Sequence, residues 1–249
     1  MSEQNLFDGQ VVLVTGAGRG LGRSIAQAFA RCGAIIAAND ITPINLDVTV
    51  QLIRETGARI NDYVADISRL MSAENFVDQV LQDWGRIDIL VNHASVRPQA
   101  NVLDFDEWDW RRTIDVNLNA PFFMTRLVGR VMREQGGGSI INVVGVSCAS
   151  QVKGQAAFSA SKLGLIGLTR ASAFELAEYN IRVNAVDPRL TEEALTALRE
   201  NELGGKRLVF TPSYPEEQGA VTLILFLCSP VGVQMNGLVV DERGQLMTD

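Results

Sequence analysis

The chain is poor in the residues that build metal sites and disulfide frameworks. It has one histidine, His93, and three cysteines among 249 residues. Cys32, Cys148 and Cys228 show no CxxC spacing, and an odd number of cysteines without a secretion signal favours buried, reduced thiols. We therefore expect neither a metal site nor a disulfide.

Long apolar runs and an excess of positive charge are also missing. No stretch reaches the roughly 18 apolar residues of a membrane span. The net charge of −7 leaves no basic stripe for a phosphate backbone, which disfavours nucleic acid as a partner. The first ten residues are too polar for a signal peptide, and no Pro- or Ser-rich linker divides the chain. We expect a single cytoplasmic domain, residues 1–249, with no membrane segment.

One glycine-rich stretch organises the chain. The apolar run VVLV at 11–14 is followed at once by TGAGRGLG at 15–22 and then by apolar residues at helical spacing. Glycines at a strand-to-helix junction let a pyrophosphate approach backbone N–H groups at the positive end of the helix dipole. A second apolar run ends at Asp40, where a carboxylate accepts hydrogen bonds from a ribose and repels a 2′-phosphate. The predicted nucleotide-binding residues are Gly16, Gly20, Gly22 and Asp40.

Strand and helix patterns alternate along the rest of the chain. Further strands are predicted near residues 60–64, 87–91, 139–144, 181–186 and 237–240, with helices near 42–57, 73–84, 105–134, 155–179 and 215–227. This alternation predicts an α/β fold, namely a single-domain Rossmann-like, doubly wound parallel sheet of about seven strands flanked by helices. The polar stretch 190–214, which contains two adjacent glycines, is predicted to be a lid-like insertion.

Polar residues follow two of the later predicted strands, at the edge where an open parallel sheet binds its ligand. Asp66 either accepts a hydrogen bond from an adenine amino group or caps the next helix. Asn92 and His93 follow the strand after that. His93 is either a base or a satisfied histidine packed near the crevice.

This series of motifs resembles the short-chain dehydrogenase/reductase family over nearly the whole chain. The family's TGxxxGxG motif is matched by Thr15, Gly16, Gly20 and Gly22. Other family positions are matched by Asp40, Asp66-Ile67, Asn117 and, in altered form, Asn92-His93-Ala94-Ser95. The resemblance implies NAD as the cofactor, because Asp40 disfavours NADP, and adds Asp66 and Asn92 to the cofactor-binding residues.

The resemblance also implies that the catalytic tetrad is degenerate. Active members carry Asn, Ser, Tyr and Lys where this chain has Asn117, Gly145, Phe158 and Lys162. Phenylalanine has no proton to transfer and glycine no hydroxyl to hold the substrate oxygen, and each loss costs about 10²–10⁴ in rate. Lys162 either bonds a nucleotide ribose or covers helix surface, and Asn117 can bond helix backbone.

Four nearby serines are expected to be poor substitutes for the missing groups. They are Ser147, Ser150, Ser159 and Ser161. The nicotinamide end departs from the family as well. Arg189 stands for a glycine, Ser95 for another, and Arg243-Gly244-Gln245 for Asp-Gly-Gly. Five departures around one pocket predict that catalysis is no longer performed there.

The resemblance favours a non-catalytic subunit that stabilises an active family paralogue in a hetero-oligomer with two copies of each chain. Two surfaces are predicted for this assembly, the small-residue face Ala156, Ala160 and Gly164, and helix 221–227 with strand 237–240. The family includes such pairs that act on hydroxyacyl-CoA esters, for example hydroxybenzylsuccinyl-CoA. NAD binding by this chain is then expected to be weak or vestigial. The alternatives are an active NAD-dependent alcohol/ketone oxidoreductase with a non-standard proton donor, such as His93 or a group of the substrate, and a nucleotide-sensing regulator.

Overall fold

The computed structural model describes residues 6–145, 153–189, 219–241 and 244–247. They contain a seven-stranded sheet of order β3-β2-β1-β4-β5-β6-β7, in which every strand pairing is parallel. The strands are β1 Val11–Thr15, β2 Ile35–Asp40, β3 Ile60–Val64, β4 Ile89–Asn92, β5 Gly138–Val143, β6 Ile181–Val186 and β7 Val239–Val240. The predicted α/β fold is confirmed.

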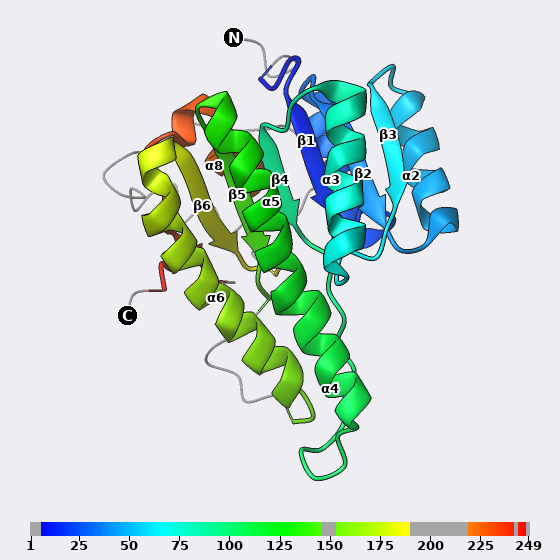
Figure 1. Cartoon of the computed structure of the whole chain (residues 1–249), viewed down its shortest axis with the longest axis vertical. Coiled ribbons are helices and arrows are strands. Elements are labelled where there is room, and N and C mark those ends of the chain that lie inside the picture. Colours follow the sequence, from blue (N-terminus) through cyan, green and yellow to red (C-terminus); the bar gives the residue numbers. More distant parts are fainter. Residues whose placement is uncertain (1–5, 146–152, 190–218, 242–243, 248–249) are drawn as a thin grey trace.

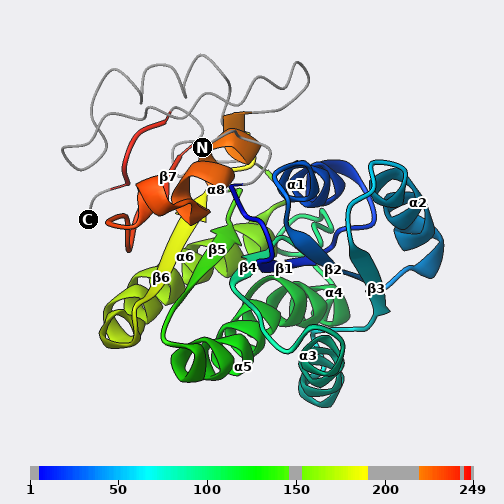
Figure 2. The ribbon, with the colours of Figure 1, turned by 90° about the horizontal axis from the view of Figure 1, so that it is seen from above.

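Helices cover both faces of the sheet (Figures 1 and 2). One face carries α1 Gly20–Arg31, α2 Pro43–Arg54 and α8 Gly219–Cys228. The other carries α3 Leu70–Trp84, α5 Ala120–Gln135 and α6 Ala156–Leu176, with α4 Glu107–Ile114 running into α5. Each helical layer encloses its own apolar core. Because both faces are covered, β1 is buried along its whole length, which explains its continuous apolar run.

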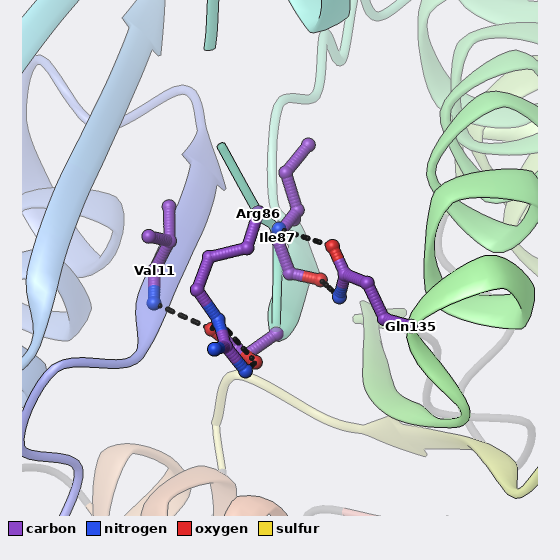
Figure 3. Close-up of polar contacts among 5 residues, drawn as sticks. Val11, Arg86, Ile87 and Gln135 are labelled. Atoms are coloured by element: carbon purple, nitrogen blue, oxygen red, sulfur yellow. Dashed lines mark hydrogen bonds and ion pairs between the residues drawn. The ribbon is translucent and has the colours of Figure 1, made fainter. Parts of the chain in front are cut away.

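Strand β4 begins at Ile89, two residues later than the apolar pattern predicts, and the backbone of Ile87 pairs with a side chain. The Ile87 N–H donates to the side-chain oxygen of Gln135 at 3.0 Å, and the Gln135 amide donates back to the Ile87 carbonyl at 2.9 Å (Figure 3). Beside them, Asp88 accepts from the Val11 N–H at 2.8 Å and pairs with Arg86 at 2.6 Å. These contacts tie the amino ends of β1 and β4 to the last residue of α5.

The predicted long helix 105–134 is interrupted, and the interruption lies just before Pro121. A π-helical turn, Asp115–Asn119, joins α4 to α5. Pro121 lies in the first turn of α5, where its missing N–H has little cost. The wider turn carries Asn117, which is fully buried. Such π-helical turns often occur at functional sites.

Some predictions fall outside the described residues, and one is wrong. Outside the described residues lie the predicted lid-like insertion and Ser147, Cys148, Ser150 and Arg243. The second predicted assembly surface is wrong for its helix, because residues 221–227 are at most 5% exposed in the single chain. Their apolar side chains pack inside the protein instead of facing a partner.

Two of the three cysteines lie among the residues that the structure describes. Cys32 and Cys228 are buried free thiols. Within the described ranges, no cluster of histidine, cysteine and acidic side chains has the make-up of a metal site. No helix in this part of the chain has the length and apolar character to cross a membrane.

Candidate nucleotide-binding crevice

The glycine turn between β1 and α1 packs too closely for side chains. Gly16 has φ +67°, and a Cβ there would lie 2.9 Å from the Ala94 Cα. A Cβ on Gly22 would lie 2.1 Å from the Gly16 carbonyl oxygen. The first turn of α1, which opens at Gly20, therefore presents bare backbone at the carboxyl edge of the sheet. This arrangement suits a pyrophosphate, as the sequence predicts.

Asp40 is held rigidly at the end of β2, facing this turn. One carboxylate oxygen accepts from the Gly18 N–H at 3.1 Å and the other from the Thr42 N–H at 3.0 Å. A Cβ on Gly18 would come within 2.6 Å of the carboxylate. Each carboxylate oxygen keeps lone pairs that a ribose hydroxyl can use.

A cavity of about 350 Å³ opens over these strand ends. It is lined from β1, β2, β3 and β4 by, among others, Gly16, Asp40, Asp66, Ile67, His93 and Ser95. Asp66 does not cap α3, since that helix begins at Leu70 without a side-chain cap. Its carboxylate instead accepts from the Ser68 N–H at 3.1 Å and from the Ser68 hydroxyl at 2.6 Å. The capping alternative is therefore wrong, while the contact with adenine stays a prediction.

Asn92 does not line this cavity. Its side chain is 3% exposed and donates to the Asn142 side chain at 2.9 Å. Asn142 in turn donates to the Thr169 hydroxyl at 2.9 Å. This chain of polar groups joins β4, β5 and α6. The structure thus places the predicted cofactor residue Asn92 inside the sheet layer, where it holds the scaffold.

His93 packs behind the glycine turn. Its Nδ1 is buried and has no hydrogen-bond partner among the described residues. Burial, and then the charge of Lys162, lower the pKa of His93 to about 4. The backbone N–H groups of His93 and Ala94 are bound by the Thr15 hydroxyl at 3.0 and 3.1 Å. Because the pKa of His93 is about 4, its imidazole is neutral at physiological pH.

The four tetrad positions come together at the other end of the crevice. The Phe158 Cζ lies 3.7 Å from the place that a Cβ of Gly145 would take. Lys162 lies with its Nζ 5.8 Å from the centroid of the Phe158 ring. Asn117 reaches the same helix through a 3.1 Å hydrogen bond to the Ser161 hydroxyl. The residues that sequence reasoning assigns to the tetrad are neighbours in space.

Lys162 and Asn117 both bind backbone in ways that the sequence does not reveal. The Lys162 Nζ is buried, donates to the Val143 carbonyl at 2.9 Å, and has a pKa that burial lowers to about 8. It does not cover helix surface. Asn117 bonds no helix backbone, because its side chain pairs with both the N–H and the carbonyl of Val96 at 2.9 Å. Each is a structural link with a defined partner.

Gly145 lacks the serine hydroxyl, and its backbone conformation also disfavours a side chain. Its φ of +74° lies in the left-handed region that favours glycine, so a serine there would be strained. A Cβ would also lie 3.4 Å from the Pro188 Cγ. The one-letter pattern gives no sign of this left-handed conformation.

Two residues at this end were missed by sequence reasoning. The Arg97 guanidinium lies 5.6 Å from the centroid of the Phe158 ring, so the ring contacts two cations. Asp187 is buried, and its carboxylate accepts hydrogen bonds from the Arg189 backbone N–H at 2.9 Å and from the Arg189 guanidinium at 3.0 Å. The sequence could have indicated Asp187, because it is an acid directly after β6. Arg97 is 61 positions from Phe158, and no local pattern links the two residues.

The described residues fit the adenosine half of NAD. Gly16, Gly20 and Gly22 would receive its pyrophosphate and Asp40 its ribose, and NAD supplies a hydride acceptor when bound. At the reaction end, neither Gly145 nor Phe158 offers a hydrogen-bond donor or a titratable proton. Proton transfer from the tyrosine position is not available in this chain.

Comparison with known proteins gives one consistent result. The family model described as "short chain dehydrogenase" matches residues 10–203. The 3-oxoacyl-[acyl-carrier-protein] reductase FabG of Thermotoga maritima is 36% identical over 245 residues, covering 97% of this chain and 99% of that protein. The (2S)-[(R)-hydroxy(phenyl)methyl]succinyl-CoA dehydrogenase subunit BbsD of Thauera aromatica is 37% identical over 181 residues, covering 73% of each chain.

A solved structure shares the whole fold. The 7α-hydroxysteroid dehydrogenase in complex with NADH and 7-oxo glycochenodeoxycholic acid superposes with a TM-score of 0.81 at 26% identity. The match covers 100% of this chain and 98% of that one. That relative therefore binds a nicotinamide cofactor on the same sheet topology.

Proposed function

This chain belongs to the short-chain dehydrogenase family, and on that premise we propose that it is a catalytically deficient subunit that stabilises an active, NAD-dependent paralogue in a hetero-oligomer. The observation that carries the proposal is the phenyl ring of Phe158 between Gly145 and Lys162. General acid–base catalysis needs a proton donor within hydrogen-bond reach of the substrate oxygen. A phenyl ring supplies none, and the neighbouring glycine cannot hold that oxygen.

The tetrad residues that this chain retains support a role in assembly rather than in turnover. Lys162 and Asn117, the two retained tetrad residues, each hold a backbone segment in place. Their retention therefore preserves the fold even where the reaction is absent. NAD is the cofactor of the proposed active partner, and its binding to this chain is weak or vestigial.

The proposed reaction is oxidation of the alcohol of a hydroxyacyl-CoA ester to a ketone by the active partner. Its support is the relative from Thauera aromatica, which is a subunit of a dehydrogenase for a succinyl-CoA derivative that carries a hydroxyl group. The other similar proteins include a reductase and a dehydrogenase that are named for different substrates, so the CoA ester is the finer part of the proposal. Both subunits would work in the cytoplasm.

The outer side of α6 supplies the proposed assembly surface. Ala160 is exposed, and Leu163 and Phe174 on the same helix are 49% and 88% exposed. Gly164 faces inward instead, because a Cβ there would lie 3.0 Å from the Leu118 side chain of its own chain. A charged residue at Ala160 therefore tests the surface, whereas one at Gly164 would disturb the packing of the chain itself.

Co-purification with a family member that carries the intact tetrad tests this function. We expect a complex with two copies of each chain, no turnover by this chain alone, and loss of the partner's solubility or activity when it is produced alone. Ala160→Glu should have the same effect on the partner without touching its active site. A stable monomer here, together with a partner that works equally well without it, would refute the proposal.

The second candidate is an active NAD-dependent oxidoreductase with a non-standard proton donor. Its support is that the similar proteins are oxidoreductases and that His93 lines the crevice. It predicts robust turnover by the pure chain that His93→Ala abolishes. Absence of turnover with a panel of alcohols and hydroxyacyl-CoA esters decides against it.

A further inference from the structure

Helix α2 is apolar on two opposite faces, although only one of them packs against the sheet. Its inner face buries Leu46, Val50 and Ile53 in the core. Its outer face carries an apolar stripe made of Ile44, Val48 and Leu52, which are 73%, 43% and 37% exposed. Side chains four residues apart are neighbours on a helix, so the three form one continuous ridge. A helix that covers a sheet needs a single apolar face, and the core therefore does not account for the stripe.

Helix α3 shows what another outer helix of the same sheet exposes. Its exposed residues after the first turn are all polar, namely Asn75, Asp78, Gln79, Gln82 and Asp83. Met71, in the first turn, is a single exposed apolar residue. Single apolar residues are ordinary on a protein surface, whereas a contiguous apolar patch marks a contact site. The outer face of α2 thus has the composition of a contact surface, and that of α3 does not.

A groove of about 520 Å³ lies beside the stripe, between α2 and β3. Three carboxylates line it, those of Asp47, Glu55 and Asp62. Arg54 is the one basic residue among its described lining residues, and it donates to the Ile60 carbonyl at 3.5 Å. Asp47 and Asp62 make no hydrogen bond or ion pair within the part of the chain that the structure describes. The border of the stripe therefore carries negative charge that this chain does not neutralise.

We propose that this face of α2 binds a basic amphipathic helix of another protein. Its apolar side chains pack against the stripe, and its lysines or arginines pair with Asp47 and Asp62. A ridge of residues spaced by four fits between the side-chain rows of a second helix, which sets the shape of the partner. The carboxylates set its charge. A second copy of this chain would bring the same carboxylates, and a nucleic acid or an anionic lipid surface would be repelled by them.

The surface lies apart from the assembly surface on α6. Helix α2 covers β2 and the edge strand β3, whereas α6 lies at the other side of the sheet (Figure 2). A partner on α2 and a subunit on α6 can therefore be bound at the same time. The inference goes beyond the subunit role and does not depend on it.

The test uses the full chain and a fluorescent synthetic helix of about 18 residues, or five turns, with leucines along one face and lysines on its flanks. Fluorescence anisotropy measures the dissociation constant. Val48→Lys should weaken binding by about tenfold or more, because it places a cation in the ridge. Ile44→Lys, at the most exposed position of the stripe, should have the same effect. Met71→Lys is the matched control, since it makes the same charge change at an exposed apolar residue of α3, and it should leave binding unchanged.

Reversal of the charges gives a second readout. The double variant Asp47→Lys, Asp62→Lys should lose affinity for the lysine peptide and gain affinity for the same peptide with glutamates in place of the lysines. Circular dichroism verifies that each variant is folded.

Three results would overturn the inference. The first is no binding of the lysine peptide by the unmodified chain. The second is equal weakening by Val48→Lys and Met71→Lys, which would show attraction to the net charge of −7 alone. The third is self-association of this chain that Val48→Lys abolishes, because the occupant is then a second copy. All three leave the tetrad and the proposed subunit role untouched.

Discussion

The two ends of the crevice differ in what they have kept. At the adenosine end, the glycine turn and Asp40 retain the family pattern, and two backbone N–H groups lock the Asp40 carboxylate in place. At the reaction end, Phe158 and a left-handed Gly145 stand where proton transfer needs hydroxyl groups. The first end is built by β1 and β2 and the second by β5, α6 and β6. Chemistry can therefore be lost at one end without loss of the architecture at the other.

The reaction end also shows which residues serve the fold. Asn117 and Lys162 remain, and both bind backbone carbonyl groups of neighbouring segments. The groups that act only on substrate, a tyrosine hydroxyl and a serine hydroxyl, are absent.

Turnover is the largest expected difference between the two ends. The isolated chain should oxidise alcohols at least about 10⁴ times more slowly than an active relative, because the general acid is missing. Phe158→Tyr with Gly145→Ser should restore at most a trace, since serine is strained at the φ of Gly145. NADH absorbance measures both rates. Full activity of the double variant would show that the backbone at Gly145 presents no obstacle.

Removal of Asn117 should show its structural role. Asn117→Ala leaves the N–H and the carbonyl of Val96 without their partner, which should lower the free energy of unfolding by about 2–3 kcal/mol. Asn119→Ala is the matched control, because among the described residues the Asn119 side chain bonds only the exposed Asp115. It should change stability by less than about 0.5 kcal/mol. Urea denaturation measures both, and equal effects would contradict the assigned role.

His93 should make stability depend on pH. Its pKa is about 4 in the folded chain and about 6.5 when unfolded, so the unfolded state binds the extra proton and stability is lost as pH falls from 6.5 toward 4. Between pH 6.5 and 5 the loss should be about 1.5 kcal/mol. His93→Asn should lack this component. Because the chain has no other histidine, parallel pH curves for the two proteins would show that the imidazole is not desolvated.

Nucleotide affinity is the smallest expected effect. Asp40→Ala should weaken both NAD and ADP-ribose by up to about tenfold, or 1.4 kcal/mol, since both ligands carry the adenosine ribose. ADP-ribose should bind at least as well as NAD, because the reaction end adds no favourable contact. Calorimetry provides the comparison. Tight NAD binding that exceeds ADP-ribose binding tenfold would show that the nicotinamide end is intact.

The sequence predicts the fold well where local patterns decide it. Strands β3 and β6 have the predicted bounds, since their apolar residues and flanking turns are local signals. The predicted start of β4 is two residues too early, and at Ile87 the backbone binds Gln135, 48 residues away. Such a contact leaves no trace in the pattern around Ile87.

At the site, the sequence identifies the residues but not their conformations. The spacing of the family's motif assigns Gly145, Phe158 and Lys162 to one site. It does not reveal the left-handed backbone of Gly145 or the burial of Lys162. Asn92 has the expected position at the end of β4, yet its side chain points between strands to Asn142. The direction of a side chain and the sign of a backbone φ angle depend on tertiary packing, which a single sequence does not display.

The central claim is that this chain contributes structure and its partner contributes the chemistry. The most direct measurement is the dehydrogenase rate of the assembled complex after the partner's catalytic tyrosine is replaced by phenylalanine, with assembly verified by ultracentrifugation. The account predicts an intact complex with no turnover above background. Substantial residual turnover that His93→Ala in this chain then removes would contradict the account.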